Sequence, residues 1–198
     1  MAQLVLASAS PRRRELLDQI GVPHRVQPVD IDETPRLNES PRAYVERLAL
    51  EKAQRGFEAG GADWPALGSD TAVILDGEIL GKPADEEDAV RTLLRLSGRR
   101  HQVMTGVAVA NGDHCRVETV ITEVSFIDFD EHCARQYWAS GEPVDKAGSY
   151  GIQGLGAVFV ESISGSYSAV VGLPLAQTAT ILKEFNIKVW QTVPASSA

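Results

Sequence analysis

Three arginines stand together where a helix is expected to begin. The segment 8–14, Ser-Ala-Ser-Pro-Arg-Arg-Arg, places a capping serine and a proline just before them, which is the signature of a helix N-terminus. Cations are unfavourable there, because the end of the helix carries a partial positive charge and unpaired N–H groups. A bound anion would reverse that balance. Helical neighbours point about 100° apart, so we expect two of the three arginines to reach one ligand. A solvated surface patch is the alternative.

Carboxylates stand in two places that suit catalysis or metal binding. Asp70 stands at the end of an apolar stretch, in the segment 66–71, Ala-Leu-Gly-Ser-Asp-Thr, and is expected at a strand end, where α/β proteins often carry functional groups. A turn or capping residue is the alternative. The acidic loop, residues 30–39, carries Asp30, Asp32 and Glu33, whose oxygens could bind a hard cation such as Mg²⁺. Loops are often acidic for solubility alone, so this signal is weak by itself.

Lysines and one glycine-rich segment add further candidates. Only five lysines stand against fourteen arginines, and Lys52, Lys82 and Lys146 lie beside groups that could form a site. Each could equally be an exposed charge. The glycine-rich segment, residues 148–156, matches neither the P-loop nor the dinucleotide-binding pattern. Its backbone could approach a flat ligand, with the Gln153 amide on the edge of a base, or it could be a tight irregular loop.

The elements that must position these groups alternate between strand and helix. Strands are predicted at 3–7, 24–29, 102–110, 115–127 and 157–163, with a hairpin over 72–80. Helices are predicted from Ser10 to Gly21, from Ser40 to about Glu58, and over 85–97, 131–140 and 174–185. Cap residues, helical periodicity and β-branched runs support these assignments. The alternation predicts an α/β protein with a mixed sheet and flanking helices.

Composition narrows the classes of protein. The 198 residues are 43% hydrophobic and 23% charged, which suits a globular chain with one large domain or two small lobes. A net charge of −8 argues against a non-specific nucleic-acid binder. No apolar run is long enough to cross a bilayer, and the first eight residues lack the basic start of a signal peptide. Two cysteines give no disulfide framework. We expect a cytoplasmic protein without nucleic-acid or membrane partners.

Taken in order, these segments resemble the Maf-like nucleotide pyrophosphatases over essentially the whole chain. The resemblance rests on SASPRRREL at 8–16, GSDTAVIL at 68–75, GKP at 81–83, DKAGSYGIQG at 145–154 and VVGLPL at 170–175. Several motifs in the same order and with matching separations make the resemblance specific, whereas a single glycine-rich motif would not. The detailed form is similar to the branch that acts on dTTP and UTP.

The resemblance implies a hydrolase that uses Mg²⁺ or Mn²⁺ to split nucleoside triphosphates between the α and β phosphates. The products would be a nucleoside monophosphate and pyrophosphate. The implied fold is a single elongated α/β domain over residues 1–198, with two lobes around a central cleft, and homodimers are common in the family. Two alternatives stay open: a non-catalytic nucleotide-binding regulator of cell division, and a phosphohydrolase that releases the γ-phosphate.

The resemblance also implies roles for individual residues. The position of Asp70 is that of the catalytic base, and Asp70 and Glu33 belong to the metal site. Base preference is associated with Arg12, Thr71 and Gln153. The phosphate region is lined by Ser8, Arg13, Lys52 and Lys82.

Overall fold

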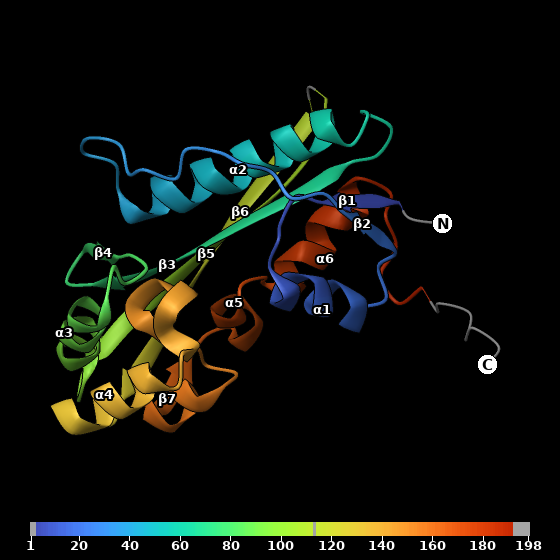
Figure 1. Ribbon diagram of the computed structural model, residues 1–198. Helices are drawn as coiled ribbons and strands as arrows, with labels where there is room; N and C mark the ends of the chain where they lie inside the picture. Colours follow the sequence, from blue (N-terminus) through green and yellow to red (C-terminus); the bar gives the residue numbers. More distant parts are fainter. Residues whose placement is uncertain (1–2, 113, 192–198) are drawn as a thin grey trace. The chain divides into compact units, whose positions relative to one another are not determined.

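The computed structural model describes residues 3–112 and 114–191, in which helices and strands alternate (Figure 1). The strands are β1 (Leu4–Leu6), β2 (His24–Val26), β3 (Ala66–Leu75), β4 (Glu78–Leu80), β5 (Arg100–Asn111), β6 (His114–Phe126) and β7 (Val160–Ser164). The α-helices are α1 (Pro11–Gln19), α2 (Pro41–Ala59), α3 (Glu86–Leu96), α4 (Glu131–Ala139), α5 (Tyr167–Val171) and α6 (Leu175–Glu184). Short 3₁₀ helices cover Glu142–Asp145, Ala147–Ser149 and Leu155–Phe159.

The strands form one mixed sheet. Their order is β2-β1-β3-β5-β6-β7, with β4 paired to β3. Strand β1 runs parallel to both β2 and β3, whereas β4 runs antiparallel to β3 and β7 antiparallel to β6. The predicted α/β fold with a mixed sheet and flanking helices is therefore confirmed. Among the described residues, no helix combines the length and apolar character needed to cross a membrane.

The chain packs as two compact units. The first contains the chain up to Asp70, Gly106–Thr119 and the part from Gly172 onward, and the second contains Thr71–Thr105 and Val120–Val171. The boundaries fall inside β3, β5 and β6, so these strands contribute residues to both units. The expected single domain, its elongated shape and its cleft stay predictions.

In the first unit, α2 packs closely against the sheet because glycines face it. A Cβ atom on Gly68 of β3 would lie 2.3 Å from the Ala49 carbonyl oxygen, and one on Gly106 of β5 would lie 2.5 Å from that of Val45. Side chains larger than hydrogen would push the helix away. The close approach buries one face of α2, and that face includes Lys52.

The second unit has an aromatic and aliphatic core beneath α3 and α4. Its aromatic members are Phe126, Phe129, Tyr137, Tyr150 and Phe159. The rings of Phe129 and Phe159 lie 4.3 Å apart, and those of Tyr137 and Phe159 lie 5.1 Å apart. This core holds the segment that follows α4, which includes the glycine-rich segment.

Most predicted elements are present, and the differences concern short ones. The strand predicted at 157–163 begins as the 3₁₀ helix Leu155–Phe159, and β7 follows only from Val160. The strand predicted at 24–29 pairs only over His24–Val26. Helix α5 was not predicted, because a five-residue helix is too short to show a helical period.

Candidate active site

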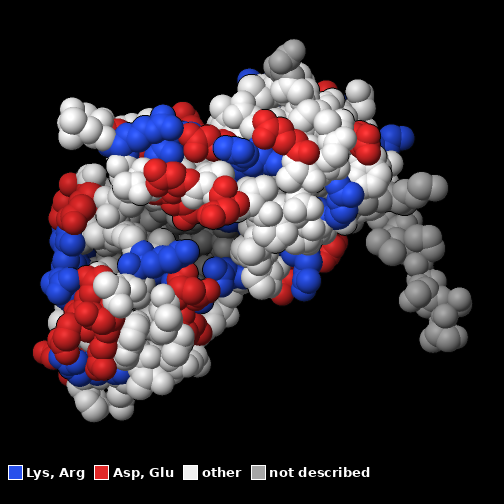
Figure 2. All heavy atoms as spheres, turned by 45° about the horizontal axis from the view of Figure 1, so that its top comes forward, with Lys and Arg blue, Asp and Glu red and all other residues white. Residues whose placement is uncertain are grey.

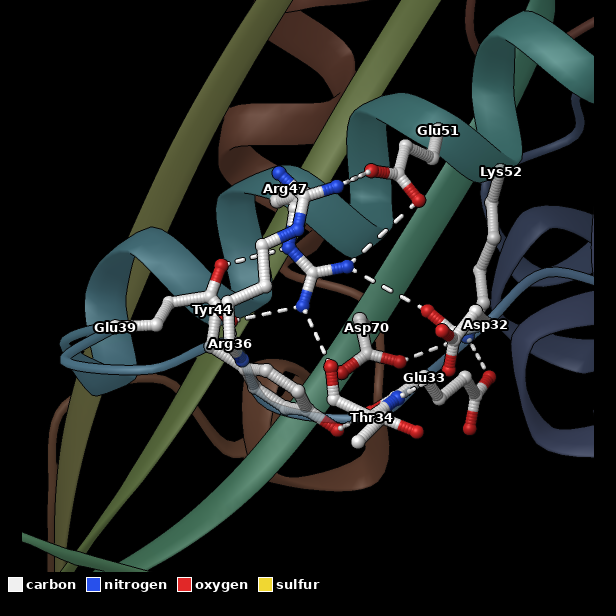
Figure 3. A network of polar contacts seen from close by, with 10 residues as sticks. All are labelled: Asp32, Glu33, Thr34, Arg36, Glu39, Tyr44, Arg47, Glu51, Lys52 and Asp70. Atoms are coloured by element: carbon white, nitrogen blue, oxygen red, sulfur yellow. Dashed lines mark hydrogen bonds and ion pairs between the residues drawn. The ribbon is translucent and has the colours of Figure 1, made fainter.

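Lys52 of α2 joins two carboxylates in the first unit (Figure 3). Its Nζ lies 2.8 Å from Asp70 Oδ1 and 2.6 Å from Glu33 Oε1. Lys52 and Asp70 are only 8% and 7% exposed, whereas the Glu33 side chain is 47% exposed. Burying a charge is costly unless it is paired. The structure thus brings three predicted site residues together as one compact charged group.

Asp70 lies in the middle of β3, not at a strand end as predicted. The apolar stretch before it and the first arm of the predicted hairpin belong to one ten-residue strand, Ala66–Leu75. The hairpin itself is confirmed, since Val73–Leu75 pair with β4. The strand continues through Ser69 and Asp70 because both side chains find partners inside the protein.

Helix α1 begins at Pro11 as predicted, but the side chain of Ser10 does not cap it. Ser10 occupies the N-cap position without a side-chain cap bond. Instead, Ser8 Oγ accepts the Ser10 N–H at 3.2 Å and Arg13 Nη1 at 3.3 Å. Arg13 Nε donates to the carbonyl oxygen of Gly172 at 2.8 Å. Ser8 and Arg13, predicted to bind phosphate, are therefore in direct contact.

The Arg13 side chain is partly buried. Burial lowers the pKa of Arg13 below its ordinary 12.5; Asp70 and Glu33 oppose that fall, and Arg12 adds to it. Because arginine stays protonated at neutral pH, Arg13 remains a cation near two carboxylates. Arg12 is half-buried and Arg14 is exposed. That two of the three arginines serve one ligand stays a prediction.

Ser69, next to Asp70 in β3, contacts the Gly172 carbonyl group. Its buried Oγ lies 2.9 Å from the Gly172 carbonyl oxygen and 2.8 Å from the Gly106 carbonyl oxygen, and its one proton can be donated to either of them. The same Gly172 oxygen accepts Arg13 Nε. Ser69 was not predicted as a site residue, although its place beside Asp70 was a usable signal.

The acidic loop is held against α2 by Arg47 and Tyr44 (Figure 3). Arg47 forms a two-point pair with Glu39, Nε to Oε1 at 2.6 Å and Nη2 to Oε2 at 2.8 Å. Both side chains are about nine-tenths buried. Arg47 also donates to the Thr34 carbonyl at 3.2 Å, and the Tyr44 hydroxyl donates to the Glu33 carbonyl at 3.0 Å. The backbone that carries Glu33 is thereby fixed.

Electrostatics keep these anchors in their hydrogen-bonding forms. Hydrogen bonding from Arg47 lowers the pKa of Glu39 to about 2, so the pair stays charged at neutral pH. Burial, reinforced by the charges of Asp70 and Glu33, raises the pKa of Tyr44 to about 12, so its hydroxyl stays a donor. Neither Tyr44 nor Arg47 was predicted from the sequence, because a tyrosine and an arginine three positions apart are common on the surface of a helix.

The other predicted site residues belong to the second unit, and Thr71 is oriented there by Thr105. The two Oγ1 atoms lie 3.0 Å apart, and Thr105 Oγ1 donates to the Ala169 carbonyl at 2.7 Å. A hydroxyl has one proton, so Thr71 is the donor within this pair. Toward any further group the Thr71 oxygen can only accept.

Lys82 and Gln153 lie on neighbouring segments of the second unit. Lys82 is exposed two residues after the end of β4, and the carbonyl oxygen of the intervening Gly81 accepts the Gly148 N–H at 3.0 Å. The segment with Lys82 therefore borders the glycine-rich segment, on which the Gln153 side chain is exposed. Both side chains lie at the surface of this unit.

Asp70 and Glu33 suit a divalent cation that arrives with a phosphate ligand. Over residues 3–112 and 114–191, no three His, Cys, Asp or Glu side chains gather as a metal cage. Mg²⁺ is usually held by only one or two carboxylates, with phosphate oxygens and waters as its other ligands. Two carboxylates that already converge on one ammonium group fit this pattern.

Charged side chains of both signs alternate over the face shown in Figure 2. Charged side chains of opposite sign also form ion pairs, such as Arg36 with Glu51 at 3.0 Å. Non-specific nucleic-acid binding instead uses a continuous basic face.

Comparison with known proteins places the chain in a family. A model of the family described as "Maf-like protein" matches residues 3–185. The chain is 57% identical over 192 residues to a "dTTP/UTP pyrophosphatase" of Shewanella oneidensis, covering 93% of this chain and 98% of that one. It is 52% identical over 190 residues to a protein of the same name from Hahella chejuensis, covering 95% and 94%. The structure of a HAM1 protein from Coxiella burnetii aligns with a TM-score of 0.53 at 18% identity, covering 93% of this chain and 100% of that one, which shows the fold. A family match that extends from β1 to the end of α6, together with these identities, makes this chain a member of the Maf-like protein family.

Proposed function

We propose that this protein is a nucleoside triphosphate pyrophosphatase that hydrolyses dTTP and UTP to the monophosphate and pyrophosphate, assisted by Mg²⁺ or Mn²⁺. Relatives named dTTP/UTP pyrophosphatase, identical at more than half of the aligned positions, support the substrate class. The observation that carries the proposal is the buried contact of Lys52 with Asp70 and Glu33. It supplies a candidate base, a cation and a second carboxylate in one place.

In the proposed reaction, Asp70 accepts a proton from the water that attacks the α-phosphorus. The bond from the α-phosphorus to the oxygen bridging it to the β-phosphorus breaks, and that oxygen leaves with the electron pair as part of pyrophosphate. Lys52 orients the Asp70 carboxylate through its hydrogen bond to Oδ1. A well-placed general base contributes about 10²- to 10⁴-fold to such a step.

Phosphate charge is neutralised by residues of this chain and by the cation. A triphosphate brings about four negative charges, so a protein with a net charge of −8 must offset them locally. Ser8, Arg13, Lys52 and Lys82 are proposed to bind the phosphates. Asp70 and Glu33 would hold the divalent cation, which when bound would neutralise charge and polarise phosphoryl oxygens.

Base selection is proposed to involve Gln153, Thr71 and Arg12. The Gln153 amide offers one acceptor and two donors, which complement the ring N–H and a carbonyl of uracil or thymine. Cytosine lacks that N–H and replaces one carbonyl with an amino group. Each mismatched buried polar group costs roughly 1–3 kcal/mol, or about a 5- to 150-fold preference.

The test is a nucleotide panel in which phosphate and pyrophosphate are measured separately. We expect dTTP and UTP to be cleaved well ahead of CTP and the purine triphosphates, to pyrophosphate and monophosphate, with no turnover in EDTA. Release of single phosphate would identify the wrong bond. Binding without turnover in Mg²⁺ and Mn²⁺ would favour the nucleotide-binding regulator.

The proposal also includes a cytoplasmic location, where nucleoside triphosphates are available, and a homodimer, which light scattering can test.

A further inference from the structure

Glu142 binds the backbone after Gln153 from within the second unit. Its Oε2 accepts the Leu155 N–H at 2.7 Å, and its Oε1 accepts the Gly156 N–H at 3.0 Å and the Tyr137 hydroxyl at 2.6 Å. Burial alone would raise the pKa of Glu142, but these three donors outweigh it and lower the pKa below 4.5. The carboxylate is therefore charged, and charge-assisted hydrogen bonds are about twice as strong as neutral ones.

Tyr137 extends this contact to the backbone before Gln153. Its hydroxyl oxygen accepts the Gly151 N–H at 3.1 Å while its proton is donated to Glu142. Two side chains in direct contact therefore bind the chain on both sides of Gln153. We call Glu142 and Tyr137 the loop clamp.

The clamp also accounts for two of the glycines. A Cβ atom on Gly154 would lie 2.1 Å from Glu142 Oε2, and one on Gly156 would lie 2.5 Å from the Tyr137 hydroxyl oxygen. Only glycine fits in these places. The interpretation that the glycines let a flat ligand approach is therefore unnecessary at these two positions, where the approaching groups are side chains of the same unit.

The start of the glycine-rich segment is fixed as well. Ser149 has a φ of +61° and is fully buried, and within the described chain its hydroxyl has no hydrogen-bond partner. Such backbone strain persists only where the surrounding structure enforces it. The next residue, Tyr150, is buried with its hydroxyl 2.8 Å from His101 Nε2. Gln153 thus stands exposed at the tip of a segment anchored at both ends.

We propose that Glu142 and Tyr137 are positioning residues for Gln153 and determine how sharply the protein discriminates between bases. The inference rests on the proposed function, in which Gln153 reads the base. A fixed backbone holds the amide where only the correct edge satisfies it. A loosened backbone would let the amide shift to accommodate a mismatched base, so the cost of the mismatch would fall.

The test compares Glu142→Gln and Tyr137→Phe with the unmodified protein. Tyr137→Phe keeps the ring packed on Phe159 and removes only the hydroxyl, so it remains informative if Glu142→Gln folds poorly. We expect the ratio of kcat/KM for dTTP to that for CTP to fall by at least about 5-fold in both variants. In a Gln153→Ala background, the same substitutions should change the ratio by less than about 2-fold. Glu131→Gln, which alters an exposed carboxylate of α4, should leave the ratio unchanged.

Two readouts separate this inference from the proposed function. Hydrogen exchange at the Leu155 and Gly156 amides should accelerate in both variants, and binding of non-hydrolysable dTTP and dCTP analogues should show the same loss of discrimination. If the unmodified protein cleaves no nucleotide, the proposed function fails, and the analogue ratios still decide the inference. An unchanged ratio despite faster exchange would overturn the inference. An equal loss of discrimination with and without Gln153 would also overturn it.

Discussion

Lys52→Met is the most direct test of the charged group at the centre of the candidate site. Methionine keeps much of the apolar stem and removes the ammonium that lies 2.8 Å from Asp70 and 2.6 Å from Glu33. Removing one partner of a buried ion pair costs about 3–5 kcal/mol, because the other charge is left buried. Glu33 is half exposed, so we take the lower value, about 3 kcal/mol. For a chain of this size, that loss lowers Tm by roughly 6–12 °C.

A divalent cation should restore part of this stability. Without the ammonium, Asp70 and Glu33 lose their shared cation, although the charge of Arg13 still acts on both carboxylates. Two carboxylates that have lost this contact suit Mg²⁺ or Mn²⁺. A ligand present at 100 times its Kd stabilises the folded state by about 2.7 kcal/mol. In the unmodified protein, Lys52 competes for the same oxygens. We therefore expect the cation to raise Tm more for Lys52→Met than for the unmodified protein.

The measurement is thermal unfolding at pH 7 in EDTA and in Mn²⁺, without nucleotide. Lys183→Met, at an exposed lysine of α6, controls for the loss of one positive charge. Lys52→Met combined with Asp70→Asn should be more stable in EDTA than Lys52→Met alone, because the buried negative charge is gone. The reasoning is refuted if Lys52→Met melts within about 2 °C of the unmodified protein in EDTA, or if Mn²⁺ raises both Tm values equally.

Three further predictions concern Asp70, Arg47 and His101. Asp70→Asn should lower pyrophosphate release at least ~100-fold with an unchanged circular dichroism spectrum, and a near-normal rate would remove Asp70 as the base. Arg47→Met should speed amide exchange in the acidic loop and raise the Mg²⁺ concentration for half-maximal activity several-fold, whereas Arg42→Met, on the exposed face of α2, should do neither. Burial lowers the pKa of His101 to about 4, so the unfolded chain binds a proton first, and stability is lost as pH falls from about 6.5 to 4. The free energy of unfolding should fall by roughly 3 kcal/mol over this range. Unfolding measured from pH 7 to 4 checks this, and an equal loss of stability in His101→Asn and the unmodified protein would contradict it.

Local signals in the sequence predicted the elements well where they were strong. The Ser-Pro pairs marked the starts of α1 and α2, and Asp76-Gly77 marked the turn between β3 and β4. These signals act within a few residues, since a cap or a turn satisfies its own backbone neighbours. They predicted the α/β fold together with the order of helices and strands.

The same signals were insufficient where a residue's role depends on distant partners. Asp70 seemed to end a strand, yet Lys52 and the packing of α2 allow it to lie in the middle of one. Gly154 and Gly156 seemed to make room for a ligand, yet they make room for Glu142 and Tyr137. The local sequence cannot distinguish these alternatives. A carboxylate can stand at the end or in the middle of a strand, and a glycine can make room for a ligand or for another side chain.

The sequence by itself determined the family resemblance, the chemical types of the candidate site residues and the elements that carry them, because motifs and periodicity are properties of neighbouring residues. The tertiary structure alone decided which charges meet. Arg13 reaches the Gly172 carbonyl across 159 positions, and Arg47 holds the loop that carries Glu33. Such contacts arise from the packing of whole elements, in which burial makes each charge find a partner, and no local pattern specifies which partner that is.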